Sequence, residues 1–253
     1  MLPHSKICLI TGATSGIGEA TARLLSKQGF SLILCGRRSE RLLDLEAELS
    51  EKVGIHTLCF DISKRADVEA ALASLPLEWQ NIDILVNNAG NAHGFDLFQE
   101  GKIEDWEMMI DINLKGLLYI SQPVIQGMVK RKFGQIINIG SIAGKEVYPK
   151  GNVYSATKHA VDALTTAMRM DLNAENIRVC SINPGMVNTE FSNVRFKGDV
   201  NKAEKVYEGM TPLVPNDIAE IILFVITRPP HVTVADLTVL PTAQASATIV
   251  KRD

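Results

Sequence analysis

Two side chains with complementary chemistry, Tyr154 and Lys158, lie four residues apart in the stretch YSATK. No Gly or Pro occurs between residues 152 and 172, so a helix is predicted there, and this spacing puts both side chains on one face. A neighbouring ammonium stabilises a phenolate and lowers the tyrosine pKa from about 10, which suits proton transfer near neutral pH. A surface helix can carry the same pair by chance, so a catalytic role needs support from the rest of the chain.

A glycine-rich stretch, TGATSGIG, places Gly12, Gly16 and Gly18 between a predicted strand and a predicted helix. Such a turn lets backbone N–H groups approach a pyrophosphate at the helix N-terminus. The spacing differs from the commonest dinucleotide fingerprint, and a purely structural turn is the alternative. Its position after the first strand favours nucleotide binding.

Two arginines, Arg37 and Arg38, follow the second predicted strand. In NAD-binding sheets an acidic residue at this place holds the ribose hydroxyls, whereas arginine accommodates a 2′-phosphate. The alternative is a pair of solvated side chains before a helix, where the positive end of the dipole makes cations slightly unfavourable. The pair therefore predicts NADP(H) as the cofactor.

Strand and helix patterns alternate along the whole chain. The predicted strands are seven short apolar runs at residues 6–11, 30–36, 55–61, 82–88, 134–140, 177–183 and 236–241. Most are apolar on both faces, which is typical of a parallel sheet covered by helices. Between them lie amphipathic helical patterns such as residues 39–53. We predict an α/β protein: one Rossmann-type domain over residues 1–253, with a seven-stranded, mainly parallel sheet and helices on both faces.

One long region from residue 184 to about residue 215 has no clear helix or strand pattern and contains several Gly and Pro residues. A loop of that length in a compact domain is usually functional. We therefore predict a substrate lid at about residues 185–215.

The composition fits one domain, because 253 residues with 46% hydrophobic side chains can bury a sizeable core. A net charge of −3 gives no overall field for nucleic acid or an anionic membrane, so neither is an expected partner. Residues 1–6 contain no apolar signal core, and no stretch approaches the length of a membrane span. A cytoplasmic protein is expected.

The cysteines and histidines show no metal-ligand spacing, so no metal site is predicted. Each cysteine lies in an apolar run, which favours a small core residue in a reducing compartment. The cysteines are Cys8, Cys35, Cys59 and Cys180. The scattered histidines are His4, His56, His93, His159 and His231.

With TGATSGIG, the motif NNAG at residues 87–90, Ser141 and YSATK in this order, the chain resembles the short-chain dehydrogenases/reductases over almost its whole length. Each motif alone is weak, but four of them in order, at strand ends or on the adjoining helix, are specific. The resemblance implies an NADP-dependent oxidoreductase acting on CH–OH groups.

The resemblance also implies four catalytic residues: Asn113, Ser141, Tyr154 and Lys158. Read through the family, Ser141 hydrogen-bonds the substrate oxygen and Tyr154 is the general acid/base. Lys158 then holds the nicotinamide ribose and lowers the Tyr154 pKa, and Asn113 holds a water of the proton relay. The alternative for Asn113 is that its amide satisfies nearby backbone groups.

Other positions are implied by the same resemblance as cofactor contacts. Asp61 matches a residue that contacts the adenine, with a helix N-cap as the alternative. Asn87 matches a residue that steadies the sheet and lines the cofactor cleft. The implied cofactor-binding residues are Gly12, Thr14, Ser15, Gly16, Ile17, Gly18, Arg37, Arg38, Asp61, Ile62, Asn87, Tyr154, Lys158, Pro184, Gly185, Val187 and Thr189.

A narrower resemblance concerns the substrate. The stretch TEFSNVRFKGD at residues 189–199, with GNVYSATK and the closing PTAQ, is similar to the bacterial NADP-dependent 3-hydroxy acid dehydrogenases. These act on serine, allo-threonine, 3-hydroxypropionate and related acids, among which the sequence does not choose. A carboxylate substrate favours a forked cationic donor, so Arg195 is an expected substrate contact and Lys197 could assist. Ser141 and Tyr154 are the other expected substrate contacts. The alternative is that Arg195 and Lys197 are exposed charges or subunit contacts.

Two long helical patterns, at residues 103–132 and 152–174, carry apolar residues on more than one stripe, so one face is expected on the sheet and another on a partner subunit. In the resembling family such helices form a dimer and the C-terminal tail often completes a tetramer, which implies a homotetramer.

Two other functions remain open. A short-chain reductase for acyl carriers, dicarbonyls or steroids would not need Arg195, and a non-catalytic NADP-sensing protein would not need the complete catalytic set.

Overall fold

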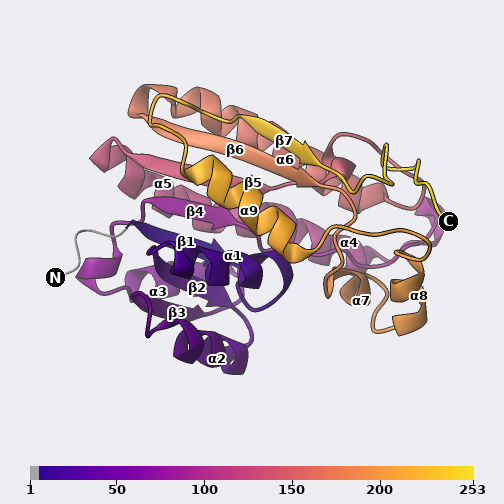
Figure 1. Cartoon of the computed structure of the whole chain (residues 1–253), viewed down its shortest axis with the longest axis horizontal. Coiled ribbons are helices and arrows are strands. Elements are labelled where there is room, and N and C mark those ends of the chain that lie inside the picture. Colours follow the sequence, from indigo (N-terminus) through magenta and orange to yellow (C-terminus); the bar gives the residue numbers. More distant parts are fainter. Residues whose placement is uncertain (1–5) are drawn as a thin grey trace.

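The seven strands form one sheet in the computed structural model, which describes residues 6–253 (Figure 1). All neighbouring strands are parallel, in the order β3-β2-β1-β4-β5-β6-β7. The strands are β1 (Ile7–Thr11), β2 (Ser31–Gly36), β3 (Ile55–Cys59), β4 (Ile84–Asn87), β5 (Gly134–Ile139), β6 (Ile177–Pro184) and β7 (Asp236–Val239). The order reverses between β1 and β4, which opens a crevice at their carboxyl ends where such folds bind ligands. The predicted fold class is confirmed. The expectation that the first residues contain no apolar signal core falls on residues 1–5, which lie outside the described part of the chain.

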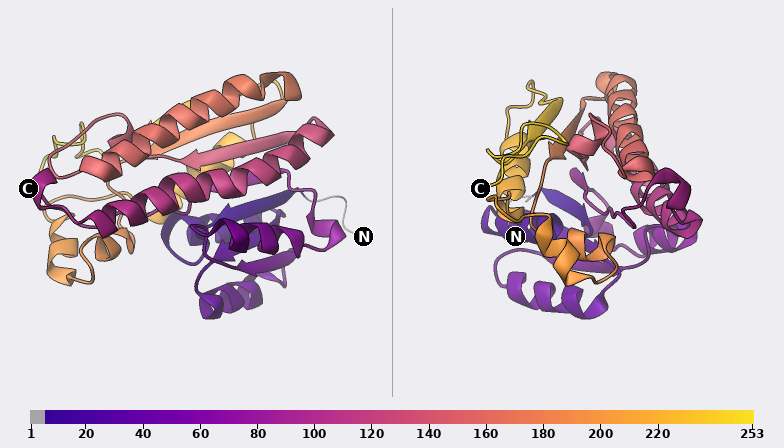
Figure 2. Two further views of the ribbon diagram at one scale, coloured as in Figure 1. Left: turned by 180° about the vertical axis from the view of Figure 1, so that it is seen from behind. Right: turned by 90° about the vertical axis from the view of Figure 1, so that its right-hand side faces the viewer.

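Helices cover both faces of the sheet (Figure 2). One face packs against α1 (Gly16–Lys27), α2 (Ser39–Leu49) and α9 (Pro215–Ile226). The other face packs against α3 (Arg65–Ala73), α5 (Leu117–Arg131) and α6 (Asn152–Asp171). Alternate strand residues enter the two cores: in β1, Cys8 faces the first and Leu9 the second. This is why the strands are apolar on both sides rather than alternating.

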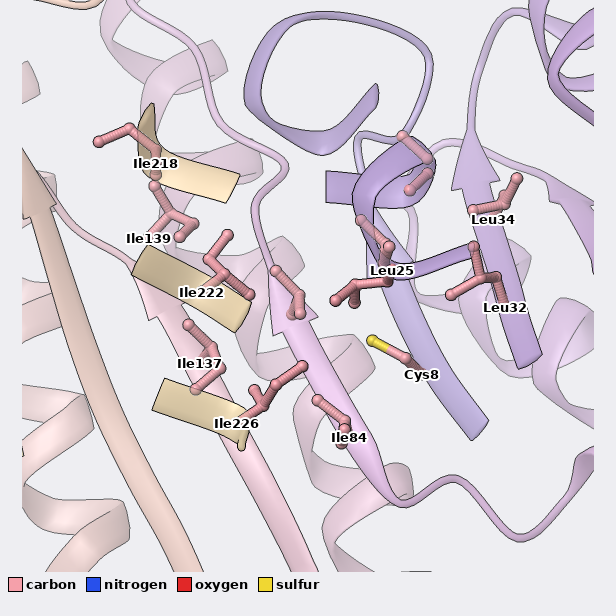
Figure 3. Packing of buried hydrophobic residues seen from close by; sticks show 14 of the residues in the cluster. Cys8, Leu25, Leu32, Leu34, Ile84, Ile137, Ile139, Ile218, Ile222 and Ile226 are labelled. Atoms are coloured by element: carbon pink, nitrogen blue, oxygen red, sulfur yellow. The ribbon is translucent and has the colours of Figure 1, made fainter. Parts of the chain in front are cut away.

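The first core is dense beneath α9, as Figure 3 shows. Ile218, Ile222 and Ile226 recur every fourth residue, so they form one stripe of the helix, and they lie over Ile137 and Ile139 of β5. The α9 residues are at most 1% exposed. Burying each such side chain contributes roughly 1.5–3 kcal/mol, which fixes the sheet that carries the site.

The polypeptide from residue 103 to residue 131 is one continuous helical rod with a π-helical segment inside it. It runs from α4 (Ile103–Ile110) through a π turn (Asp111–Gly116) into α5. A Cβ on Gly116 would lie 3.1 Å from Ile62, so a side chain there would crowd the loop after β3. Single π turns in α-helices are often functional, and this one carries Asn113. No helix within residues 6–253 is long and apolar enough to cross a membrane.

Three local expectations were wrong. The helix expected over residues 39–53 ends at Leu49. Cys59 is exposed rather than in the core, because it is the last residue of the edge strand β3. The region from residue 184 to 215 is not wholly irregular, since it contains α7 (Phe191–Arg195) and α8 (Val200–Lys205) beyond the carboxyl ends of the strands (Figure 1).

Candidate active site

A cleft of about 830 Å³ opens at the carboxyl ends of the central strands, between the glycine-rich loop, the start of α6 and the residue 185–215 segment. Most of the residues expected in the site line it. They are Gly12, Thr14, Ser15, Gly16, Ile17, Arg37, Arg38, Ile62, Ser141, Tyr154, Lys158, Pro184, Gly185, Val187, Thr189 and Arg195. Four expected residues do not line it: Gly18, Asp61, Asn87 and Asn113.

The glycine-rich loop requires glycine for two different reasons. Gly12 and Gly16 have φ angles of 66° and 53°, in the left-handed region that L side chains rarely adopt. Gly18 is buried in α1, and a Cβ there would lie 2.3 Å from the Gly12 carbonyl oxygen. Gly18 therefore packs the helix against the loop, while Gly12 and Gly16 shape the cleft wall.

Asp61 and Asn87 stand just behind the cleft. The Asp61 carboxylate accepts hydrogen bonds from the Ser63 N–H at 3.0 Å and the Ser63 hydroxyl at 2.8 Å, so it caps the local turn. Asn87 donates through Nδ2 to Ser121 and to Asn138 on β5, each at 2.8 Å. The bond to the neighbouring strand agrees with the expected role of Asn87 in steadying the sheet, while its contact with the cofactor stays a prediction.

Both polar atoms of the Asn113 amide bond to protein groups. Its Oδ1 accepts from the Asn91 N–H, and its Nδ2 donates to the Asn91 carbonyl, both at 2.8 Å, and to Thr157 Oγ1 at 3.2 Å. This is the backbone-satisfying alternative from the sequence. Asn113 nevertheless lies near Lys158, because a Cβ on Gly90 would be 3.3 Å from Asn113 Oδ1 and 3.5 Å from Lys158 Nζ. A relay water at Asn113 stays a prediction.

Tyr154 and Lys158 both project from α6 into the cleft, as their spacing predicts. Burial raises the pKa of Tyr154 to about 12, against a hydrogen bond with Ser141 and the positive charge of Arg195, which both lower it. Lys158 donates through Nζ to the Ile139 carbonyl at 2.9 Å and stands 6.0 Å from the Tyr154 ring centre. Burial lowers the pKa of Lys158 to about 8. The expected lowering of the Tyr154 pKa was wrong, because desolvation of the phenol dominates.

Tyr154 of the ligand-free protein should therefore remain a neutral phenol across the physiological range. An acid whose pKa is raised keeps its proton to higher pH, so Tyr154 should not ionise between about pH 7 and pH 10. Spectrophotometric titration at the phenolate band checks this, with the Tyr154→Phe variant as reference. The two titration curves should coincide in that range, and a phenolate step near neutral pH that disappears in the variant would refute the assignment.

Arg195 sits in a cage of aromatic rings. Its Cζ lies 5.1 Å from the ring centres of Tyr154 and Phe95, 5.6 Å from Tyr148 and 6.0 Å from Phe191. Its Nη2 donates to the Tyr148 hydroxyl at 2.6 Å, and its Nε is buried without a partner. Within residues 6–253 no carboxylate pairs with this guanidinium. The arrangement leaves a cationic donor beside the Tyr154 ring.

Lys197 does not share this pocket. Its Nζ forms an ion pair with Asp105 of α4 at 2.8 Å, where the Asp105 side chain is only 8% exposed. The expectation that Lys197 assists with a substrate carboxylate was therefore wrong. Its charge is satisfied by the body of the domain, and the pair ties the residue 185–215 segment to α4.

The two arginines expected to bind the cofactor, Arg37 and Arg38, have different surroundings. Arg37 lines the cleft and is exposed. Arg38 donates to Ser15 Oγ at 2.7 Å, to Thr14 Oγ1 at 3.0 Å and to Glu190 at 2.8 Å. Sequence reasoning missed Glu190, which lies 152 residues from Arg38 along the chain, so only the fold brings the two together. Two further residues missed are Arg41, one helical turn after Arg38, and Tyr148, the Arg195 partner.

This fold, the glycine-rich cleft and the Ser–Tyr–Lys arrangement define a nucleotide-dependent oxidoreductase, and the chain belongs to the short chain dehydrogenase family, whose model matches residues 6–199. Among individual relatives, it is 50% identical over 242 residues to the NADP-dependent 3-hydroxy acid dehydrogenase YdfG of Escherichia coli K12, covering 95% of this chain and 97% of that protein. It is 43% identical to sulfoacetaldehyde reductase 2 of Chromohalobacter salexigens over 98% of this chain and all of that protein. The solved structure of a closed form of serine dehydrogenase with NADP+ superposes with a TM-score of 0.92, at 49% identity over 98% of this chain and all of that one.

Proposed function

We propose that the protein transfers a hydride between C3 of a small 3-hydroxy acid and NADP(H). The observation that carries this proposal is the Arg195 guanidinium, held by aromatic rings beside Tyr154 and without a carboxylate partner in the described chain. A substrate carboxylate is the complementary group. The 3-hydroxy acid and serine dehydrogenases among the relatives support the same substrate class.

The cleft fits NADP in shape and charge. Left-handed glycines at residues 12 and 16 keep its wall free of side chains, and Arg38 already faces an anion, the Glu190 carboxylate. The glycine-rich loop would hold the pyrophosphate, Arg37 and Arg38 the 2′-phosphate, and Lys158 the nicotinamide ribose. When bound, NADP+ supplies the hydride acceptor of the reaction.

The side chains then divide the remaining work. Arg195 binds the carboxylate, and the Ser141 hydroxyl hydrogen-bonds the oxygen on C3. In the reductive direction Tyr154 donates its phenolic proton to that oxygen, which suits a group that burial keeps protonated. In the oxidative direction its phenolate accepts the proton of the hydroxyl. Lys158 and a water at Asn113 would return the proton to solvent.

The segment at about residues 185–215 would act as the substrate lid. It carries Arg195 and is attached to the rest of the domain by the Lys197–Asp105 ion pair and by the Gly94 N–H, which donates to the Arg195 carbonyl at 3.1 Å. These attachments support a lid that closes over the substrate and keeps water from the reacting atoms.

The proposed function is tested by the appearance of NADPH absorbance with a panel of alcohols, using NADP+ and NAD+ in parallel. The panel contains serine, allo-threonine, 3-hydroxypropionate, 3-hydroxyisobutyrate and uncharged alcohols of similar size. Because one relative is a sulfoacetaldehyde reductase, it also contains 2-hydroxyethanesulfonate, whose sulfonate could bind Arg195 in place of a carboxylate. Turnover confined to the 3-hydroxy acids and NADP+ is expected. Turnover only on the sulfonate or on uncharged alcohols would show that 3-hydroxy acids are not the substrate class.

A homotetramer is proposed as the assembly in solution, in the cytoplasm. Apolar side chains on the α4–α5 rod remain exposed in the single chain: Ile103 is 56% exposed, Met108 41% and Leu118 40%. Burying them against the same surface of a second copy would remove this apolar area from water. Light scattering should give four times the mass of the 27.7 kDa chain. A monomeric mass at micromolar concentration would contradict the proposal.

A further inference from the structure

A carboxylate of the protein itself occupies the arginine cluster at the end of β2. Glu190 bridges two guanidinium groups, with Oε2 at 2.8 Å from Arg38 Nη1 and Oε1 at 2.8 Å from Arg41 Nη1. The hydrogen bond from Arg38 lowers the pKa of Glu190, so the carboxylate is charged at neutral pH. Glu190 therefore neutralises part of the positive charge expected to receive a phosphate.

Arg38 already donates hydrogen bonds through all three of its guanidinium nitrogens. Its Nε donates to Thr14 Oγ1, its Nη1 to Glu190, and its Nη2 to the Thr14 carbonyl, Thr14 Oγ1 and Ser15 Oγ. A phosphate that binds where the Nη1 groups of Arg38 and Arg41 meet competes with the Glu190 carboxylate for these donors. Glu190 is the partner with the same sign of charge as the phosphate, so it is the one that repulsion would remove.

We propose that Glu190 is an internal competitor of the cofactor's 2′-phosphate and thereby limits how strongly the cleft prefers NADP(H) over NAD(H). This inference rests on the proposed function, in which Arg38 binds that phosphate. A cofactor with a 2′-phosphate displaces the Glu190 carboxylate, whereas one with a free 2′-hydroxyl leaves the ion pairs intact.

Displacement of Glu190 has a second consequence, because Glu190 is the residue immediately before α7 and Arg195 is the last residue of that helix. Arg38 and Arg41 therefore hold, through Glu190, the start of the helix α7 that ends at Arg195. When the 2′-phosphate replaces the Glu190 carboxylate on these arginines, binding at the adenosine end of the cleft is linked to the position of Arg195 in the substrate pocket.

The test is direct binding of NADPH and NADH, followed by nicotinamide fluorescence, to the unmodified protein and to Glu190→Gln. Removing the competing charge should tighten NADPH binding by roughly 3- to 10-fold, the range set by partly exposed ion pairs, and should change NADH binding by less than about 2-fold. Calorimetry with adenosine 2′,5′-bisphosphate and adenosine 5′-phosphate should show the same contrast without the nicotinamide. Glu40→Gln is the matched control, since Glu40 lies between Arg38 and Arg41 in sequence and forms no ion pair within residues 6–253.

Three results would overturn the inference. Weaker NADPH binding by Glu190→Gln would mean that Glu190 organises the arginines for the phosphate. Equal tightening of NADPH and NADH, or the same effect in Glu40→Gln, would mean a general charge effect. Unchanged binding would mean that Glu190 is not displaced. Arg38→Ala separates this from the proposed function: if it does not reduce the preference for NADPH over NADH, the 2′-phosphate site itself is wrongly placed. Thermal melting of each variant confirms that it is folded.

Discussion

Replacing Tyr154 with phenylalanine should lower kcat/KM by about 10²- to 10⁴-fold, the usual contribution of a general acid or base. The change removes one oxygen from a side chain that is 8% exposed, so the ring should keep its packing against Phe191 and beside Arg195. NADPH binding, measured by fluorescence, should therefore stay within a few fold. The rate should fall while NADPH binding is nearly unchanged, because Tyr154 donates its proton to the substrate oxygen and not to the cofactor.

Tyr119→Phe provides the matched control for this substitution, because Tyr119 belongs to α5, packs partly buried against the second core and does not line the cleft. Its activity should equal that of the unmodified protein. If Tyr154→Phe keeps more than about a tenth of the activity, the proton comes from another group, since the loss expected of a missing general acid is larger.

Replacing Arg195 with alanine should lower kcat/KM for 3-hydroxypropionate by about 30- to 5,000-fold, because truncating one partner of a buried charged pair costs roughly 2–5 kcal/mol. The corresponding amide, 3-hydroxypropionamide, lacks the negative charge, so its rate should change by only a few fold. Arg195→Lys should recover part of the loss, since lysine restores the charge but not the forked geometry. The measurement is initial-rate kinetics with both substrates.

Lys202→Ala controls for the general charge of the lid, because Lys202 also lines the cleft but its side chain is 68% exposed and pairs with Asp199. It should not change the ratio of acid to amide. Equal losses on both substrates in Arg195→Ala would show that Arg195 serves mainly to hold the lid and the Tyr154 ring. The aromatic contacts with Tyr148 and Phe191 would then be its principal role.

The sequence was sufficient for the features that depend on local patterns. Apolar runs with both faces hydrophobic predicted the parallel sheet, and the absence of Gly and Pro predicted α6 with Tyr154 and Lys158 on one face. The glycine-rich turn was placed correctly because its conformations require glycine at residues 12 and 16. In each case the residues that decide the structure are near each other in the chain.

The errors arose where contacts between distant segments decide the outcome. Lys197 forms an ion pair with Asp105, 92 residues away in the sequence, and Glu190 meets Arg38 only because the residue 185–215 segment returns to the end of β2. The Tyr154 pKa was misjudged because the sequence shows the neighbouring ammonium but not the depth of burial. Gly18 and Asn87 do not line the cleft, because Gly18 packs α1 against the loop and Asn87 bonds to β5, and a motif does not show on which side of the turn a residue lies.

We infer that this cleft selects its substrate by the carboxylate, and a comparison of an acid with its amide tests this inference. The measurement is kcat/KM of the unmodified protein with NADP+ for 3-hydroxypropionate and for 3-hydroxypropionamide, which have the same carbon chain. Loss of a charge-assisted pair with Arg195 predicts that the acid is preferred by at least about 30-fold, corresponding to roughly 2 kcal/mol. Equal values for the two substrates, or a preference for the amide, would contradict the account.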